Sequence, residues 1–472
     1  MTAVRFLLNG EPRAEDRVPP TMTVLDWLRT VAHLTGTKEG CAEGDCGACT
    51  IAIARPGDDT PRYQAVNSCL MMLPQLDGYS VLTVEGLARG DTLHSVQQAL
   101  VDADATQCGF CTPGFVMAMY AFQQGGEPPD DANIHEALAG NLCRCTGYRS
   151  IVEACRRVAG QPTEAAAPSA TVALDASSAS LEYRNEAQVF LAPRTLDEFL
   201  KVKEEHPDAV VLAGGTDLGL RVSKDGEAIP VVISTGAVAE LQQIEAGPDG
   251  LEIGGGVTYS AALPFLDNSF PAFGTLVRRI GSRQIRNLGT FAGNLATASP
   301  IGDTLPVLVA LDASVTLASR DGRRTIPVES FITGYRQTAM APNEVIASVT
   351  IPALQGKTLH VYKVSKRFDQ DISTVIAAFV LAVEDGRVKE LRAAYGGMTS
   401  RPARASHLER ALIGRAWAPE SLADVDALMA QDFAPLSDHR GGAAYRLHAA
   451  AGLVRRLLYE TTTSTPVRVE AL

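Results

Sequence analysis

The stretch "CAEGDCGACT" (residues 41–50) places three cysteines within nine residues of a 472-residue chain. Four residues separate Cys41 from Cys46, and two separate Cys46 from Cys49. This spacing is typical of the plant-type ligand loop of a [2Fe–2S] cluster, whereas zinc sites more often pair two C-x2-C knuckles. We predict that these three thiols and Cys69, after 19 intervening residues, bind one cluster. Zinc or buried structural thiols are the alternative.

Glycines and acids fill the rest of this loop. Gly40, Gly44 and Gly47 can adopt backbone conformations that a side chain would block, so the loop amides can point at the sulfur atoms. Such hydrogen bonds tune the reduction potential of a cluster. Glu43 and Asp45 have no evident role, and we expect them on a solvated face of the loop.

A second cysteine quartet follows, made of Cys108, Cys111, Cys143 and Cys145. Cys111 directly precedes a predicted helix start at Thr112–Pro113, with Thr112 as the N-cap. Cys145 precedes another predicted helix start near Tyr148. Helix N-termini favour an anionic cluster, although C-x2-C spacing also suits zinc, which stays open here. The ninth thiol, Cys155, lies on one helical face with apolar residues, and we predict a buried core thiol.

Composition narrows the class of protein. Net charge is −12, which argues against a nucleic-acid or anionic-membrane partner. The best apolar run, residues 375–383, is far too short to span a bilayer. Residues 1–16 carry no visible export signal, so a cytoplasmic location is expected. Disulfides are rare there, and metal binding is the leading explanation for nine cysteines.

The cysteines all lie in the first third of the chain, which suggests at least two chemically different parts. Residues 161–180 are Ala-, Ser- and Pro-rich and read as a linker. Before it, we predict a small α+β unit ending near 86 and a four-helix unit, whose third helix begins at Asn133. After it, residues 208–221 predict strand, glycine turn and helix, and Asp385–Gly386 predict a hairpin turn.

No Rossmann fingerprint is present, because Gly254-x-Gly256 is followed by Tyr259 in place of the third glycine. A P-loop is also missing. Two other loops, "LAGGTDLGL" (212–220) and "LGTFAGNLATASPIGD" (288–303), offer backbone amides that can approach a pyrophosphate closely. Taken alone, each loop also fits an ordinary glycine turn.

The segments "GTKEGCAEGDCGACT", "QCGFCTPGF" and "GNLCRCTGY" together resemble the iron–sulfur region of the molybdenum hydroxylases. This family includes xanthine dehydrogenase, aldehyde oxidase and carbon monoxide dehydrogenase. The resemblance covers nearly the whole chain and implies an α+β multidomain fold, with a [2Fe–2S] cluster in each of the first two domains. Along the chain, the expected parts are a β-grasp ferredoxin domain (1–86), a four-helix domain (87–160), the linker (161–180), an FAD-binding domain (181–356) and a C-terminal flavoprotein domain (357–472).

Both glycine-rich loops are similar to FAD-binding segments of the xanthine dehydrogenase type. The family often has a phenylalanine against the adenine where this chain has Ile280, so the resemblance implies apolar contact there without aromatic stacking. The FAD contacts implied by position are Val211, Leu212, Ala213, Gly214, Gly215, Thr216, Asp217, Leu218, Ile280, Thr290, Phe291, Ala292, Gly293, Asn294, Asp303, Ile346 and Lys363.

The stretch "KVSKRFDQDIS" (363–373) concentrates charge. On composition alone it is typical of a solvated loop. The resemblance implies a loop beside the flavin that governs nicotinamide access, through Lys366, Arg367, Asp369 and Asp371. Where vertebrate relatives have an "RRED"-like loop, Phe368 and Gln370 differ here.

The resemblance also implies a function. Electrons are expected to pass from a molybdenum centre on a partner subunit, through the helical-domain cluster and the ferredoxin-like cluster, to FAD and NAD+. We expect the small subunit of an (αβ)2 heterotetramer that supports oxidation of hypoxanthine and xanthine to urate, with molybdopterin and the hydroxylating residues on the partner. An aldehyde or another N-heterocycle remains open as substrate, as does a non-catalytic zinc-binding protein.

Overall fold

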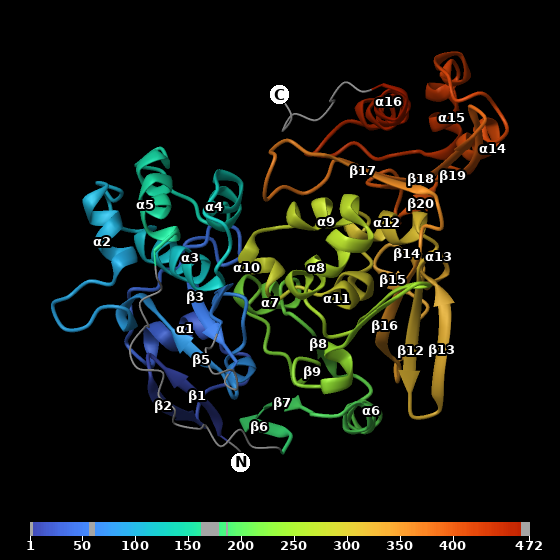
Figure 1. Ribbon diagram of the computed structural model, residues 1–472. Helices are drawn as coiled ribbons and strands as arrows, with labels where there is room; N and C mark the ends of the chain where they lie inside the picture. The colour runs from blue at the N-terminus through green and yellow to red at the C-terminus, as the bar shows by residue number, and fades with distance from the viewer. Residues whose placement is uncertain (1–2, 56–61, 162–178, 186, 464–472) are drawn as a thin grey trace. The chain divides into compact units, whose positions relative to one another are not determined.

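The computed structural model describes residues 3–55, 62–161, 179–185 and 187–463 (Figure 1). It contains two compact units. The first comprises Met1–Glu240, Thr258–Ser260 and Gly281–Thr290; the second comprises Leu241–Val257, Ala261–Ile280 and Phe291–Leu472. The predicted linker lies almost wholly outside the described residues. Among the described residues, none of the helices is long and apolar enough to cross a membrane.

The first unit begins with a five-stranded sheet in the order β2-β1-β5-β3-β4, in which β1 runs parallel to β5. Helix α1 packs Val24, Trp27 and Leu28 into the core beneath it. Strand β5 ends at Leu82, and the backbone then turns into a 3-10 helix. The elements are β1 (Val4–Leu8), β2 (Glu11–Glu15), α1 (Val24–Thr30), β3 (Thr50–Ala54), β4 (Gln64–Asn67), η1 (Leu73–Leu76), β5 (Ser80–Leu82) and η2 (Val84–Gly86).

Four helices follow around the nearly all-buried α3, as predicted: α2 (Ser95–Asp102), α3 (Thr112–Gly125), α4 (Asp131–Leu138) and α5 (Arg149–Ala159). Two predicted caps were wrong. Cys111 is the N-cap of α3, and Thr112 is already helical. Helix α4 is capped by Asp130, whose carboxylate accepts the Asn133 N–H at 2.9 Å, because a carboxylate three residues upstream captures this free amide.

The rest of the first unit is a sheet in the order β6-β7-β9-β8 with three α-helices. Its apolar face and that of the N-terminal sheet share one core, which includes Phe6, Trp27, Phe190 and Val232. The predicted strand, glycine turn and helix around residues 208–221 are confirmed as β8 and α7. The elements are β6 (Leu181–Asn185), β7 (Gln188–Ala192), α6 (Leu196–Glu205), β8 (Val210–Leu212), α7 (Leu218–Ser223), β9 (Val231–Ser234) and α10 (Arg283–Arg286).

The second unit contains a five-stranded sheet in the order β10-β11-β16-β12-β13 and a small pair, β14 and β15. Its strands are β10 (Ile244–Gly247), β11 (Gly250–Gly254), β12 (Ser314–Ser319), β13 (Gly322–Pro327), β14 (Ile332–Gly334), β15 (Gln337–Thr338) and β16 (Val345–Pro352). Its helices are α9 (Pro271–Arg278), α11 (Phe291–Thr297), α12 (Thr304–Ala310) and α13 (Val328–Phe331). Two further helices, η3 (Ala239–Gln242) and α8 (Tyr259–Ser269), each have residues in both units.

A four-stranded sheet in the order β17-β18-β19-β20 and three α-helices complete this unit around a separate core. The predicted hairpin is confirmed, and its turn residues Asp385 and Gly386 both have positive φ, at 50° and 70°. The elements are β17 (Thr358–Val364), β18 (Val375–Glu384), β19 (Arg387–Gly396), β20 (Ala403–Arg404), α14 (Ser406–Leu412), η4 (Pro419–Leu422), α15 (Val425–Asp432) and α16 (Ala443–Thr462).

Candidate cofactor sites

The first quartet gathers at one end of the N-terminal sheet. Strands β3 and β4 pair antiparallel with Thr50 opposite Asn67. Cys49 and Cys69 lie just beyond this pair, and their Sγ atoms are 3.2 Å apart. The amide of Cys46 donates to the Cys41 sulfur at 3.3 Å. A hydrogen bond from the Cys46 thiol, helped by loop amides and opposed by burial, lowers the pKa of Cys41 to about 5.

The second quartet gathers at the N-terminal end of α3. The Sγ atoms of Cys108 and Cys145 are 3.5 Å apart. The sulfur of Cys143 accepts the Cys145 amide at 3.4 Å and lies 3.3 Å from the Thr146 hydroxyl. Cys143 is buried, whereas Cys108 and Cys145 are exposed. Burial raises the pKa of Cys111 to about 12, so negative charge here depends on a bound cation.

The donor set fits a binuclear cluster at each quartet. Two thiols of each quartet lie side by side, Cys49 with Cys69 and Cys108 with Cys145, and a [2Fe–2S] cluster has two irons that share four cysteines. A Cβ at Gly40 would lie 2.7 Å from the Cys46 sulfur, which explains a glycine in this cradle.

Two buried amides join the loops of the two quartets. Asn141, two residues before Cys143, donates to the carbonyl of Gly47 at 3.0 Å. Gln284 of α10 donates in turn to the Asn141 side-chain oxygen at 3.0 Å. Sequence reasoning missed Gln284 and the whole of α10, since neither carries a motif.

Helix α7 connects the first quartet to the glycine loop that was predicted to bind FAD. Its last residue, Ser223, donates to the carbonyl of Ala42 at 2.7 Å. Lys224 pairs with Glu43 at 3.4 Å, so Glu43 is an ion-pair partner on the loop surface. A Cβ at Gly219 would lie 2.5 Å from the carbonyl oxygen of Leu70, the residue after Cys69. The helix backbone therefore lies directly against the end of this ligand set.

Within the first unit, the predicted FAD residues 211–218 and Thr290 belong to neighbouring loops. Gly215 has φ of 81°, a conformation that suits glycine. A Cβ at Gly214 would lie 1.8 Å from the carbonyl oxygen of Leu288, so no side chain fits there. Leu212 is buried, whereas Val211 is exposed. The loop offers closely approachable backbone amides, as a pyrophosphate cradle requires.

Two of the predicted FAD residues of the second unit form a buried ion pair. Lys363 of β17 donates to Asp303, the N-cap of α12, at 2.7 Å, and to the Arg279 carbonyl at 2.9 Å. Thr304, next to Asp303, donates to Asn294 at 2.6 Å.

The other predicted residues of this unit differ in what they can offer a ligand. Phe291 packs its ring on Phe273 with centroids 5.7 Å apart, which leaves only its backbone available. Ala292 and Gly293 follow it in α11. Ile346 lies buried in β16, and Ile280 is half-buried just after α9.

The charged loop after β17 is held from both ends. Lys366 donates to the carbonyl of His439 at 2.6 Å, and the Arg367 amide donates to Asp371 at 2.7 Å. Burial raises the pKa of Asp371, but backbone hydrogen bonds and Arg367 outweigh it and the pKa ends below the usual value. Asp369 lies exposed between them.

Arg279, which sequence reasoning missed, anchors the middle of the same loop. It stacks on the Phe368 ring at 4.5 Å and donates to its carbonyl at 3.1 Å. The signal that could have revealed this contact is Phe368 itself, which departs from the vertebrate pattern, because an aromatic residue in a charged loop needs a partner.

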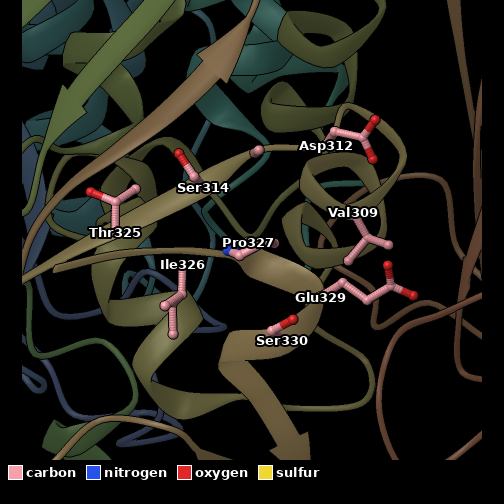
Figure 2. A pocket seen from close by; sticks show the side chains of 9 residues that line it. Val309, Asp312, Ser314, Thr325, Ile326, Pro327, Glu329 and Ser330 are labelled. Atoms are coloured by element: carbon pink, nitrogen blue, oxygen red, sulfur yellow. The ribbon is translucent and has the colours of Figure 1, made fainter.

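Figure 2 shows a cavity of 350 Å³ in the second unit, lined by residues of α12, β12, β13 and α13. Asp312 and Glu329 bring carboxylates to it. Asp312 is already paired with Arg392. None of the predicted cofactor residues lines this cavity.

Comparison with known families accounts for this arrangement. Residues 6–73 match the 2Fe-2S iron-sulfur cluster binding domain, and residues 83–156 the [2Fe-2S] binding domain. Residues 181–354 match the FAD binding domain in molybdopterin dehydrogenase. Residues 360–461 match the CO dehydrogenase flavoprotein C-terminal domain. The chain belongs to the molybdenum hydroxylase family.

Relatives of this family are similar over most of the chain. Xanthine dehydrogenase of Emericella nidulans is 32% identical over 98% of this chain, which spans 39% of that relative. A carbon monoxide dehydrogenase chain from Hydrogenophaga pseudoflava has TM-score 0.54 and 26% identity, over 57% of this chain and 94% of its own. Quinoline 2-oxidoreductase of Pseudomonas putida 86 has TM-score 0.54 and 25% identity, over 58% and 96%.

These matches confirm the predicted cofactors of the molybdenum hydroxylase part present here, two [2Fe–2S] clusters and FAD. Each quartet lies wholly inside one of the two cluster-binding matches. The zinc alternative for the second quartet is thereby overturned. Cys155 is fully buried in the core around α3, and burial raises its pKa to about 12, as expected for the predicted core thiol.

Proposed function

We propose that this chain conducts electrons from a molybdenum centre on a partner subunit to FAD and on to NAD+. The second-quartet cluster receives the electrons, and the first-quartet cluster passes them to the flavin. Bound flavin supplies the conversion of single electrons into a hydride. The observation that carries this order is the different environment of the two quartets in the first unit.

The second quartet has an open edge. Cys108 and Cys145 are exposed, and Phe110 and Leu142 beside them are 46% and 49% exposed. Exposed apolar side chains around a redox group fit a docking face for the donor subunit. The first quartet has Cys49 and Cys69 buried and lies against α7, which begins at the proposed flavin loop.

Residues of this chain would perform three tasks. The eight quartet thiolates hold the clusters, while amides such as that of Cys46 stabilise charge on sulfur. Residues 211–218 and Thr290 cradle a pyrophosphate in the first unit. In the second unit, Lys363 and Asp303 form a fixed, buried charge pair with side chains only 2% and 8% exposed, and the 366–371 loop governs nicotinamide access.

The partner and substrate follow from the relatives. The alignment with the carbon monoxide dehydrogenase chain covers 94% of that chain but only 57% of this one. Parts that are joined in this chain therefore lie on separate chains in that relative. We propose a molybdenum-cofactor large subunit and an (αβ)2 assembly in the cytoplasm. The xanthine dehydrogenase match over 98% of the chain supports hypoxanthine and xanthine as substrates. The quinoline 2-oxidoreductase match supports another N-heterocycle as the second candidate.

One experiment tests the proposal. The chain is purified with its co-purifying partner, and the complex is assayed with xanthine and NAD+, then with quinoline and an aldehyde. We expect urate formation coupled to NADH. Turnover of quinoline without xanthine would move the substrate to the second candidate, and turnover of the aldehyde alone would make an aldehyde the substrate. Oxidation of xanthine with oxygen but never with NAD+ would overturn the proposed acceptor.

A further inference from the structure

One segment of the flavin part is separated from its neighbours in the chain. Residues 261–280 and 291–472 belong to the second unit, yet Gly281–Thr290 between them belongs to the first, together with the iron–sulfur domains and the flavin part up to Glu240. This segment contains the short helix α10 and leads directly into Thr290, one of the proposed flavin contacts. What holds it therefore bears on the flavin site.

The holding contact is a charge cluster centred on Glu136 of α4. Its carboxylate accepts hydrogen bonds from both Arg283 and Arg286 of α10. The Arg286 side chain is only 2% exposed, and Glu136 is 22% exposed. Arg283 also makes a two-pronged contact with Glu127, at 2.7 and 2.9 Å. Arginine and carboxylate in this forked arrangement fix orientation as well as charge.

Amide contacts on the same helix limit its position further. Gln284 donates to Asn141 at 3.0 Å. A Cβ at Gly140 would lie 2.0 Å from the Gln284 side-chain oxygen, so α10 sits in direct contact with the turn before Cys143. Asn287, just after the helix, donates to the carbonyl of Ala65 at 2.8 Å.

The far end of the segment touches the glycine loop. The carbonyl of Leu288 occupies the space that a Cβ of Gly214 would need, at 1.8 Å. The carbonyl of Gly289 accepts the Tyr259 amide at 2.8 Å. The connection between α10 and the proposed pyrophosphate cradle is short, because only two residues, Asn287 and Leu288, lie between α10 and Gly289.

We infer that Glu136, a residue of the second [2Fe–2S] domain, is a positioning residue for the flavin. Its carboxylate holds α10 through Arg283 and Arg286, and α10 sets where Leu288–Thr290 lie against Gly214. The inference rests on the flavin site proposed above for residues 211–218 and Thr290. It means that an iron–sulfur domain completes the flavin site of this chain.

Glu136→Gln tests this in the holo complex, since it removes the charge and keeps the shape. Asp131→Asn is the matched control, because Asp131 lies on the same helix α4 but pairs with Arg156 on the surface. We expect Glu136→Gln to raise the FAD dissociation constant at least tenfold by flavin fluorescence titration, and Asp131→Asn to change it less than twofold. The electron paramagnetic resonance signals of both clusters should stay at full intensity in both variants.

A positioning role of Glu136 and misfolding of the variant predict different results for FAD affinity and turnover. Saturating FAD should restore NADH-to-dye turnover in Glu136→Gln, and Glu136→Asp should recover part of the affinity. An unchanged FAD dissociation constant in folded Glu136→Gln overturns the inference. If that variant does not fold, Arg283→Gln decides, because it removes the other side of the same contact: native FAD affinity there also overturns it. A complex that carries Gly215→Asp and binds FAD as tightly as the wild-type complex would instead overturn the proposed flavin site.

Discussion

The backbone N–H of Leu142 donates a hydrogen bond of 2.9 Å to the carbonyl oxygen of Cys46. Cys46 belongs to the first quartet, and Leu142 directly precedes Cys143 of the second. One hydrogen bond and a few covalent bonds therefore connect the two ligand sets without a van der Waals gap. Electron tunnelling decays more slowly along bonds than across gaps, so this contact is a direct route between the clusters.

Leu142→Pro should interrupt that route, because proline has no N–H to donate. We expect substrate-to-NAD+ turnover to fall on the order of tenfold, equivalent to about 1.4 kcal/mol of effective barrier. Rapid-freeze electron paramagnetic resonance then shows the second cluster reduced before the first. Leu142→Ala removes the same exposed side chain but keeps the N–H, so it should turn over about tenfold faster than Leu142→Pro. Equal rates in the two variants, with both clusters present, would place the route elsewhere.

Cys143→Ser should remove the second cluster and separate the two halves of the reaction. Substrate-to-NAD+ turnover stops, while NADH-to-dye activity at the flavin persists because it does not need that cluster. Cys155→Ala is the control, since this thiol is buried outside both quartets. It should retain both cluster signals and both activities. Equal loss of the two activities in folded Cys143→Ser protein would contradict the proposed order.

Gly215→Asp should expel FAD, because it puts a negative charge on the loop that cradles the pyrophosphate, and a Cβ there already lies 3.4 Å from the carbonyl oxygen of Leu70. Gly226→Asp is a matched control, since Gly226 also has positive φ, at 65°, with no atom within 4 Å of an added Cβ. Both variants lose about 1–2 kcal/mol to the left-handed backbone. Only Gly215→Asp should lose bound flavin, measured by absorbance after gel filtration. Full flavin occupancy there would remove this loop from the site.

Arg279→Ala should loosen the 366–371 loop, because it removes the stacking on Phe368 and two hydrogen bonds to its carbonyl. A partly exposed cation–π contact contributes about 0.5–1 kcal/mol, so we expect KM for NADH in the dye assay to rise roughly threefold to fivefold with kcat nearly unchanged. Arg278→Ala is the neighbouring control, since Arg278 pairs with Asp267 on the surface. A KM equal to that of wild type would separate this loop from nicotinamide binding.

Several features were predictable because their information is local. The ligands of the first quartet lie in one loop and at the end of one strand pair, so spacing alone identified them. Thr112–Pro113 marked a helix start within one residue, although the cap is Cys111. The turn at Asp385–Gly386 followed from its dipeptide. In each case the residues that determine the structure are close along the chain.

Other features could not be predicted, because they depend on which surfaces meet. Lys224 with Glu43 and Arg279 with Phe368 join side chains that carry no motif. Charged residues such as Lys224, Glu43 and Arg279 are common on any solvated surface, so their presence does not identify a partner.

The sequence by itself determined the cysteine spacings and the glycine loops from which the cofactor ligands are predicted, since both are encoded within short segments. Only the tertiary structure decided that α10 belongs with the iron–sulfur domains. Arg283 and Glu136 are 147 residues apart in the chain, and Gln284 and Asn141 are 143 apart. Sequence separation holds no information about such distances. They arise when buried charges and amides must find partners as the domains pack.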